Sequence, residues 1–406
     1  MRRLIVTSLA VILIVASVFA TTQFLLPSLN TNINQNPSKQ NSSFHVGVSF
    51  CGNTTDQAKL LIDRVKNYTN LLVVQSGPVS TNETSMNEIV NYAVCSGLDV
   101  IVYFGFFNPK YTWQVPWLDY AKLHWGSHFL GVYLNDEPGG QTIDANWTGY
   151  FNQIKIRDTF AYSSHGPGVN LQLNGSQPID NNEAAYHFIT AVQNGLGLNQ
   201  LKIRQITSFT SDYALYWFDY QGGYDTIFAQ FGSNQSITQT IDLARGAARQ
   251  QNKTWGTIIT WTYDRPPYLV SGPEMYSQLL TAYMAGAKYE IIFDYPQIPD
   301  NPYGILNDTH FTALEKFWNN IQNLSINNQP EAVLVLPHDY GWGMRNPNER
   351  IWGLWAPDGT SAQVWKTTQK LLGQYGTGLD IVYDDTQFPV TGKGYRQVYF
   401  WNQTVN

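Results

Sequence analysis

Short apolar runs alternate with longer amphipathic runs along most of the chain, and the two kinds of run predict different elements. A continuous apolar run of about four to eight residues is typical of a buried strand, whereas apolar residues spaced by three and four are typical of a helix. The pattern predicts strands at His45 to Cys51, Asn70 to Gln75, Leu98 to Phe106, Phe129 to Asn135, Tyr224 to Phe231, Thr257 to Thr262 and Tyr289 to Asp294. It predicts helices at Thr55 to Asn67, Ser85 to Ser96, Asn182 to Asn194, Ile237 to Gln250 and Pro273 to Gly286.

One more strand is expected before Tyr224, either around Gln205 to Phe209 or at Tyr213 to Phe218. With it, strands and helices alternate in a rhythm that predicts a parallel sheet. Eight such strands over residues 44–325 fit a (β/α)8 TIM barrel. A doubly wound open sheet is the alternative, but it lacks the support of a glycine-rich phosphate fingerprint. Residues 160–180 are rich in Ser, Gly, Pro and Asn and predict a long loop over the barrel mouth.

The rhythm changes after an Asn-rich connector that ends near Pro330. Residues 331–406 predict a second, small α/β domain that is flavodoxin-like or amidotransferase-like in its order of elements. Its predicted elements are strands at Glu331 to Pro337, Leu379 to Tyr383 and Gln397 to Trp401 and a helix at Ser361 to Tyr375. Because this domain is small, we expect it to pack on the barrel. The Gly- and Trp-rich stretch 340–358 either completes the site at the barrel mouth or joins the two domains.

The first twenty residues combine two arginines with an apolar run from Leu4 to Ala20. This pattern is typical of a signal peptide, and the run is long enough to stay as a membrane anchor. A polar linker follows over residues 21–43. We therefore expect a secreted or extracellular protein, either released after cleavage or anchored to the cell membrane by residues 4–20. Asn-x-Ser/Thr sequons favour a glycoprotein and occur at Asn41, Asn53, Asn67, Asn82, Asn146, Asn174, Asn234, Asn252, Asn307, Asn323 and Asn402.

The charge content changes the list of expected partners. Only 13% of the 406 residues are charged and the net charge is -6, so nucleic acid is not expected as a partner. No metal or cofactor motif is found, and we expect neither. Cys51 and Cys95 are predicted as two buried free thiols, since they would lie at opposite ends of the barrel. The low charge and the abundance of Asn and aromatic residues resemble secreted proteins of thermoacidophilic archaea.

The richest chemistry follows the fourth predicted strand, in Gly131-Val-Tyr-Leu-Asn-Asp-Glu-Pro-Gly-Gly140. Asp136 and Glu137 stand at the carboxyl end of that strand, where barrels of this kind carry their active sites. A structural role is the alternative, because either carboxylate could cap a helix that begins near Thr142.

The segment Asn135-Asp136-Glu137-Pro138 resembles the Asn-Glu-Pro motif of the (β/α)8 glycoside hydrolases of clan A. The stretch from Glu274 to Asp294 resembles the last helix and strand of trimeric β-galactosidases, which also carry a flavodoxin-like domain after the barrel. The resemblance implies that Glu137 is the general acid/base. Asp136 is an extra residue relative to the motif, so it is the alternative for that role.

The resemblance also implies a second carboxylate at the end of strand seven, where this chain has Asp264. The family has Glu there, and Asp294 and Asp219 are therefore kept as rivals. Asp264 could instead pair with Arg265, and Asp294 could simply form a turn. Two carboxylates are needed because one protonates the leaving oxygen while the other attacks the sugar or activates water.

Aromatic and amide side chains near the predicted strand ends are candidate contacts for a sugar. The predicted substrate-binding residues are Asn135, Trp217, Asp219, Gln230, Trp261 and Tyr263. In a chain so rich in aromatic residues, many of these side chains are equally expected in the core. Two hypotheses follow: an extracellular glycoside hydrolase with a carbohydrate substrate, or a non-catalytic glycan-binding or cell-envelope protein on the same barrel. The sugar, its anomer, the stereochemical outcome and the oligomeric state stay open.

Overall fold

The computed structural model describes residues 44–144, 147–149, 177–195, 197–232, 235–324 and 329–403. The predicted leader and linker at 1–43 and most of the predicted mouth loop lie outside these residues. Among the described residues, no helix is long and apolar enough to cross a membrane.

Eight parallel strands close into a barrel in sequence order, which confirms the predicted fold and excludes the open sheet. Closure is made between the first and last strands, where Gly47 is paired with Ile291. The strands are β1 His45–Phe50, β2 Leu71–Val74, β3 Asp99–Phe104, β4 Phe129–Leu134, β5 Thr207–Asp212, β6 Thr226–Phe231, β7 Thr254–Ile259 and β8 Tyr289–Ile292. Side chains of alternate residues fill the inside of the barrel, because successive strand residues face opposite sides. The buried interior set is Leu71, Val73, Ile101, Tyr133, Phe209, Phe228, Ile258 and Ile291.

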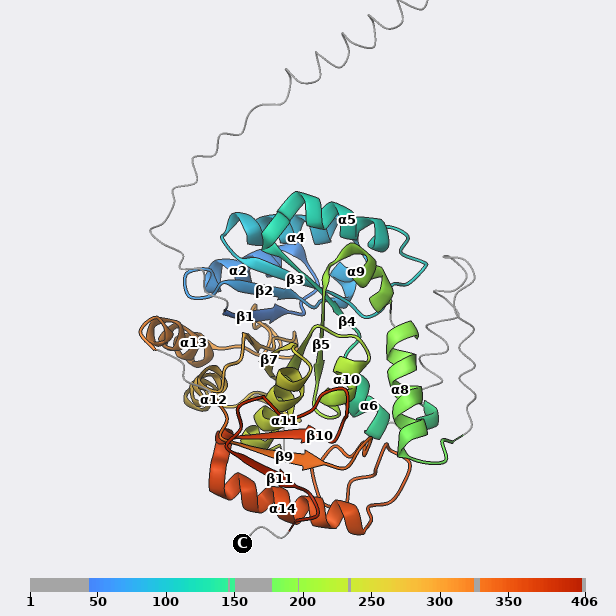
Figure 1. Cartoon of the computed structure of the whole chain (residues 1–406). Helices are drawn as coiled ribbons and strands as arrows, with labels where there is room; N and C mark the ends of the chain where they lie inside the picture. The colour runs from blue at the N-terminus through green and yellow to red at the C-terminus, as the bar shows by residue number, and fades with distance from the viewer. Residues whose placement is uncertain are drawn as a thin grey trace, which may run out of the picture. The chain divides into compact units, whose positions relative to one another are not determined.

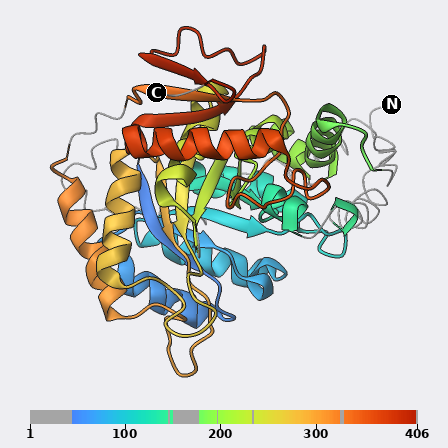
Figure 2. The same cartoon turned by 90° about the horizontal axis from the view of Figure 1, so that it is seen from below.

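Helices surround the barrel and bury its outer face, and most strands are apolar on both sides, although β5 is largely polar. They are α2 Thr55–Val65, α3 Gly77–Ser80, α4 Glu83–Cys95, α5 Gln114–Trp125, α6 Pro138–Asp144, α8 Asn181–Gly195, α9 Leu198–Arg204, α10 Tyr216–Gln221, α11 Ile237–Gln250, α12 Gly272–Met284 and α13 Asp308–Ile321. Two short 3-10 turns, Gly126–His128 and Gly376–Gly378, precede β4 and β10. Figure 2 shows α12 and α13 side by side.

The position of the fifth strand decides between the two alternatives given for it above. β5 runs over Thr207–Asp212, so it overlaps the first alternative, whereas Tyr213 to Phe218 is not a strand. Leu215 has a φ of 54°, and the helix α10 begins at the next residue. The second alternative was wrong because the large aromatic residues are buried on one helical turn, and burial alone does not distinguish a strand from a short helix.

The C-terminal residues form a three-stranded parallel sheet in the order β10, β9, β11, at Leu379–Tyr383, Ala332–Leu336 and Gln397–Phe400. In Figure 1 this sheet lies between α11 of the barrel and α14, Gly359–Tyr375. The close approach depends on Gly246 in α11, since a Cβ there would lie 2.6 Å from the Ile381 carbonyl oxygen. The sheet therefore packs on the barrel, as expected, and the described residues from 44 onward form one compact unit.

A buried ion-pair cluster anchors this packing. Arg245 of α11 donates from Nε to the Asp380 carboxylate at 2.7 Å and from Nη2 to the Leu379 carbonyl at 2.7 Å. The Tyr395 hydroxyl donates to the other Asp380 oxygen at 2.6 Å. Asp242 lies one helical turn before Arg245 and accepts from it at 3.2 Å. One cation thus holds two buried carboxylates and a carbonyl across the junction.

Both cysteines are free thiols, as expected. Cys51 is buried, but Cys95 is exposed, so the prediction of two buried thiols was wrong for Cys95. Cys95 is the last residue of α4, where the helix end meets solvent.

We predict that Arg245→Met destabilises the full chain by about 3–5 kcal/mol, because buried Asp242 loses its cation and buried Asp380 keeps only Arg249, at 3.9 Å. The measurement is urea unfolding followed by circular dichroism. Arg396→Ala is the matched control, since Arg396 is 80% exposed and pairs with Glu331 at 3.7 Å. It should change the free energy of unfolding by less than about 1 kcal/mol. Equal effects of the two substitutions would contradict an anchoring role for Arg245.

Candidate functional site

The turn after β4 holds the two predicted carboxylates in an unusual backbone conformation. Asn135 and Glu137 have φ angles of 56° and 57°, in the left-handed region that few residues other than glycine adopt. Such residues cost about 1–3 kcal/mol each and are kept where surrounding contacts impose them. One such contact is a hydrogen bond from the Glu137 amide to the Ser211 carbonyl at 2.9 Å. The end of β5 thus holds the turn that carries Glu137.

A chain of hydrogen bonds connects the two carboxylates across the ends of three strands. Asp136 accepts from the Tyr133 hydroxyl and, at 2.7 Å, from the Ser211 hydroxyl. The Gln230 amide nitrogen donates at 2.8 Å to Ser211 and at 2.8 Å to Glu137 Oε1. Asp136 and Glu137 therefore belong to one polar network, which we call the carboxylate network.

Asp212, at the end of β5, ties this network to the following helix. Its buried carboxylate accepts from the backbone amides of Gly139 at 2.6 Å, Gly140 at 2.9 Å, Tyr213 at 2.7 Å and Ala214 at 3.0 Å. The first two amides belong to the first turn of α6, which starts directly after Glu137. The alternative in which Asp136 or Glu137 caps a helix near Thr142 was wrong, because α6 begins at Pro138 and its amides bind Asp212.

Burial sets the protonation of the network. Desolvation, followed by the charge of Asp136, raises the pKa of Glu137 to about 7, against the lowering effect of Gln230. Burial also raises the pKa of Asp136, although the hydrogen bonds from Tyr133 and Ser211 oppose it. Near neutral pH, Glu137 is therefore divided between its acid and its carboxylate form, as a general acid/base requires.

Asp294 follows β8 and lies at the same end of the barrel as Glu137. It is 4% exposed, its Oδ1 accepts from the Ile305 amide at 3.1 Å, and burial raises its pKa to about 7. Burial raises the pKa of the Cys51 thiol, and the charges of Asp294 and Asp136 add to that rise. The Cys51 thiol is thus within electrostatic reach of both carboxylates, and the backbone N–H of Asp294 donates to the Ser49 hydroxyl at 3.1 Å.

Asp264 has a different environment. It is exposed in the loop between β7 and α12, and it makes no hydrogen bond or ion pair with the described residues. The same loop begins with the half-buried Trp261, whose ring centroid lies 5.2 Å from that of Tyr268 and 5.5 Å from that of Tyr295. Tyr263 is 44% exposed. Trp261 and Tyr263 are thus placed at the carboxyl end of β7, where a sugar could reach them.

Two predicted binding residues are placed in the core. Trp217 of α10 is 2% exposed and packs on Tyr383 and Phe388 of the C-terminal residues, with centroids 5.8 and 5.9 Å away. Asp219 is fully buried beside Asp212, whose charge adds to the effect of burial in raising the pKa of Asp219. Neither side chain presents a surface to a ligand, and we assign both to the core. Trp217 does not face the barrel mouth, because it lies on α10 and its side chain packs against the C-terminal residues.

Asn135 and Gln230 both lie close to Glu137, Asn135 in the same turn and Gln230 through its side chain. Asn135 is 2% exposed, and its backbone N–H donates to the Gly105 carbonyl at 3.0 Å. Gln230 is 9% exposed and uses its side-chain amide on Glu137 and Ser211. The contact with Glu137 makes Gln230 a positioning residue for the Glu137 carboxyl group.

The loop after β9 reaches α6 from the second sheet. The Arg345 guanidinium makes two hydrogen bonds to Asp144, at 2.9 and 2.5 Å, and a further one to Glu349. Asp144 also accepts from the Tyr213 hydroxyl at 2.8 Å. The stretch 340–358 thus joins the domains, and it does so through the helix that follows Glu137.

The sequence did not identify Tyr133, Ser211 and Asp212 as site residues. Tyr133 was read as one apolar residue of a strand, and the uncertain position of strand five concealed that Ser211 and Asp212 end it. The signal for this strand was weak, because Ser211-Asp212 follow the mixed run Thr207-Ser-Phe-Thr210 and not an apolar one. Among the described residues, no group of three His, Cys, Asp or Glu side chains could hold a metal ion.

No family model matches this sequence, and no curated protein matches it significantly. A GH5_18 glycoside hydrolase from Bifidobacterium longum subsp. infantis is 12% identical, with a TM-score of 0.48, and the alignment covers 89% of this chain and 97% of that chain. A GH5_18 structure from Bifidobacterium longum subsp. longum in complex with Manb1-4GlcNAc is 11% identical, with a TM-score of 0.49, covering 89% and 96%. An endo-1,4-beta-mannanase from Rhizomucor miehei is 10% identical, with a TM-score of 0.38, covering 69% and 95%. At these identities the similarity is one of barrel fold alone.

We predict that Asp136→Asn lowers the pKa of Glu137 below about 7, because a neighbouring negative charge that opposes ionisation is removed. The measurement is an NMR titration of the glutamate side-chain carboxyl carbons, with Glu137→Gln identifying the signal. Asp264→Asn is the control and should leave that pKa unchanged. An unaltered Glu137 titration in Asp136→Asn would show that the two carboxylates are not electrostatically linked.

Proposed function

We propose that the protein is a glycoside hydrolase that acts outside the cell, with Glu137 as general acid/base. The observation that carries the proposal is the carboxylate network at the barrel mouth, in which Glu137 has a pKa of about 7 and is positioned by Gln230 at 2.8 Å. A carboxyl group that stays protonated near neutral pH can protonate the oxygen of a leaving sugar. The N-terminal pattern and the sequons support the extracellular part of the proposal.

Catalysis also requires a second carboxylate. We place Asp294 in that role ahead of Asp264, because Asp294 is buried after β8 at the same end of the barrel as Glu137, whereas Asp264 is exposed in a loop. Deprotonated Asp294 would attack the anomeric carbon or take a proton from the attacking water, while Glu137 gives its proton to the glycosidic oxygen. Asp136 would stay bound to Tyr133 and Ser211 and maintain the raised pKa of Glu137 through its charge.

Substrate contacts are proposed for the aromatic residues around the end of β7. Trp261 offers a ring face, and Tyr263 and Tyr295 are 44% and 42% exposed. Ring faces of this kind stack on the C–H face of a sugar, and the Tyr hydroxyls can bind its hydroxyl groups.

A glycan-binding protein without catalysis is the second candidate. The exposed position of Asp264 favours it, since the carboxylate expected from the resemblance has no contact with the carboxylate network. The two candidates differ in one outcome: only the hydrolase loses turnover when a single carboxylate becomes an amide.

We predict that Glu137→Gln lowers kcat/KM by about 10²–10⁴-fold while sugar binding is retained, because the amide cannot donate an acidic proton. The test is a screen of the full chain on aryl glycosides and polysaccharides, followed by kinetics on the substrate found. Turnover that persists in Glu137→Gln would remove Glu137 from the mechanism. Glycan binding without turnover in the unaltered protein would support the second candidate.

Matched substitutions of Asp294 and Asp264 test which of them is the second carboxylate. We predict that Asp294→Asn abolishes turnover and that Asp264→Asn reduces it less than about threefold, since Asp294 is buried at the strand end and Asp264 is exposed in a loop. Azide added to Asp294→Gly would restore cleavage if Asp294 is a nucleophile. The opposite ranking of the two Asn variants would return the role to Asp264.

The pKa of Glu137 predicts the alkaline limb of the pH profile. Because the general acid must be protonated, kcat/KM should fall as pH rises through about 7. Asp136→Asn lowers the pKa of Glu137, so the limb should move to lower pH, and the shift is read from kcat/KM profiles of both proteins. An alkaline limb that does not move would argue against Glu137 as the titrating acid.

A further inference from the structure

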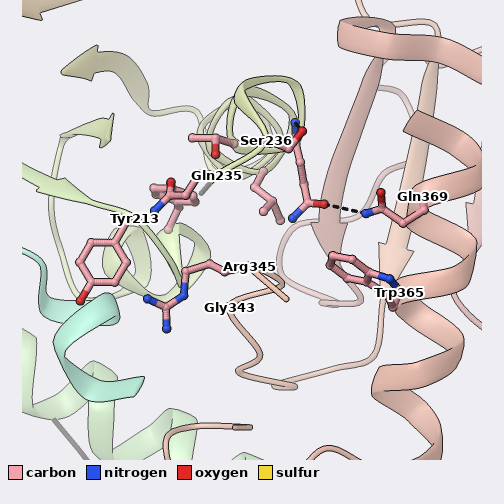
Figure 3. A pocket seen from close by; sticks show the side chains of 11 residues that line it. Tyr213, Gln235, Ser236, Gly343, Arg345, Trp365 and Gln369 are labelled. Atoms are coloured by element: carbon pink, nitrogen blue, oxygen red, sulfur yellow. Dashed lines mark hydrogen bonds between the residues drawn. The ribbon is translucent and has the colours of Figure 1, made fainter. Parts of the chain in front are cut away.

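A cavity of about 220 Å³ lies at the junction between the barrel and the C-terminal residues, apart from the carboxylate network. Its walls come from the start of α10, the first turns of α11, the loop after β9 and the helix α14 (Figure 3). It is smaller than the roughly 300 Å³ of the smallest pockets for drug-sized ligands. A ligand about the size of one sugar ring is the largest that it suits.

Two buried polar atoms in its wall have no hydrogen-bond partner among the described residues. One is the hydroxyl of Tyr216, a residue that is 2% exposed, and the other is Oε1 of Gln235. Thr240, which also lines the cavity, lies beside the Tyr216 hydroxyl without meeting the geometry of a hydrogen bond. Buried polar groups are nearly always satisfied, so both atoms point to a bound hydroxyl-bearing ligand or water.

The charges around the cavity exclude an anion. Arg345 is the cation in the wall, but its guanidinium already binds the carboxylates of Asp144 and Glu349. The backbone N–H of Gln239, at the start of α11, is likewise used, because it donates to the Ser236 hydroxyl at 3.4 Å. With two carboxylates to one guanidinium, the local charge does not attract a negative ligand.

The remaining wall is aromatic and amidic, which suits a sugar. Trp365 of α14 supplies a ring surface, whereas the Tyr213 ring is covered by the Arg345 guanidinium, 5.0 Å from its centroid. Gln369 donates to Gln239 at 3.1 Å across the cavity, and Gln239 donates in turn to the Met344 carbonyl at 2.6 Å (Figure 3). Ring faces for C–H groups and amides for hydroxyls are the combination that neutral sugars bind.

We propose that this cavity is a binding site for a single neutral sugar unit, formed jointly by the barrel and the C-terminal residues. The Tyr216 hydroxyl and the Gln235 carbonyl oxygen bind sugar hydroxyls, and the sugar ring lies against Trp365. This site is distinct from the carboxylate network and exists whether or not the barrel hydrolyses glycosides.

The test measures binding of methyl glycosides of mannose, glucose, galactose and N-acetylglucosamine to the full chain, by saturation-transfer NMR and calorimetry. Tyr216→Phe removes only the hydroxyl and should weaken binding of the recognised glycoside about three- to tenfold. It should leave Tm unchanged or higher, since a buried hydroxyl without a partner is removed. Trp365→Ala should weaken binding about tenfold. Lys366→Ala, an exposed neighbour on α14, is the control and should have no effect.

Trp261→Ala separates the two sites, because it alters the barrel mouth and not the cavity. Binding that survives Trp261→Ala and is lost in Tyr216→Phe and Trp365→Ala supports the cavity. Binding lost only in Trp261→Ala overturns the cavity and leaves the barrel site standing. Absence of binding for every glycoside up to tens of millimolar, or a lowered Tm in Tyr216→Phe with unchanged binding, also overturns it. None of these outcomes depends on turnover, so failure of the hydrolase proposal is separately visible.

Discussion

The carboxylate of Asp212 is the interaction on which the geometry of the site depends. It is buried at the end of β5 and accepts four backbone N–H groups, two from the turn after its own strand and two from the first turn of α6. Burial still raises its pKa, to about 6, so desolvation outweighs four favourable bonds. A hydrogen bond to a charged group contributes about 1.5–3 kcal/mol, enough to hold the strained turn that carries Asn135 and Glu137.

The C-terminal sheet contributes to the same geometry from outside the barrel. Arg245 and Asp380 anchor the sheet on α11, and Arg345 extends from the loop after β9 to Asp144 at the end of α6. The helix that follows Glu137 is thus held at its start by Asp212 and at its end by Arg345. The second sheet is consequently part of the support of the site, and the sugar cavity that we propose occupies the same junction.

Burial at the barrel mouth raises the pKa values of four carboxyl groups, those of Asp136, Glu137, Asp212 and Asp294. The charges that act on Glu137 are those of other carboxylates, and among the described residues no Lys or Arg side chain forms an ion pair with Asp136, Glu137 or Asp294. Hydroxyl, amide and backbone N–H groups take the place of cations. Such neutral donors orient a carboxyl group without forcing it to ionise, which leaves Glu137 able to give and take a proton near neutral pH.

The sequence by itself determined the barrel, since buried strands alternating with amphipathic helices have few other solutions, and it determined the position of Asp136 and Glu137 at a strand end. Tertiary structure decided which polar groups surround them. Ser211, Asp212 and Gln230 meet Glu137 only because β4, β5 and β6 are neighbours in a closed barrel. The same closure left Asp264 in solvent and buried Trp217 under the second sheet. The local pattern of apolar and polar residues indicates which residues are buried and whether they repeat as in a strand or a helix. Contacts between residues some 75 to 95 positions apart depend instead on the register of the strands.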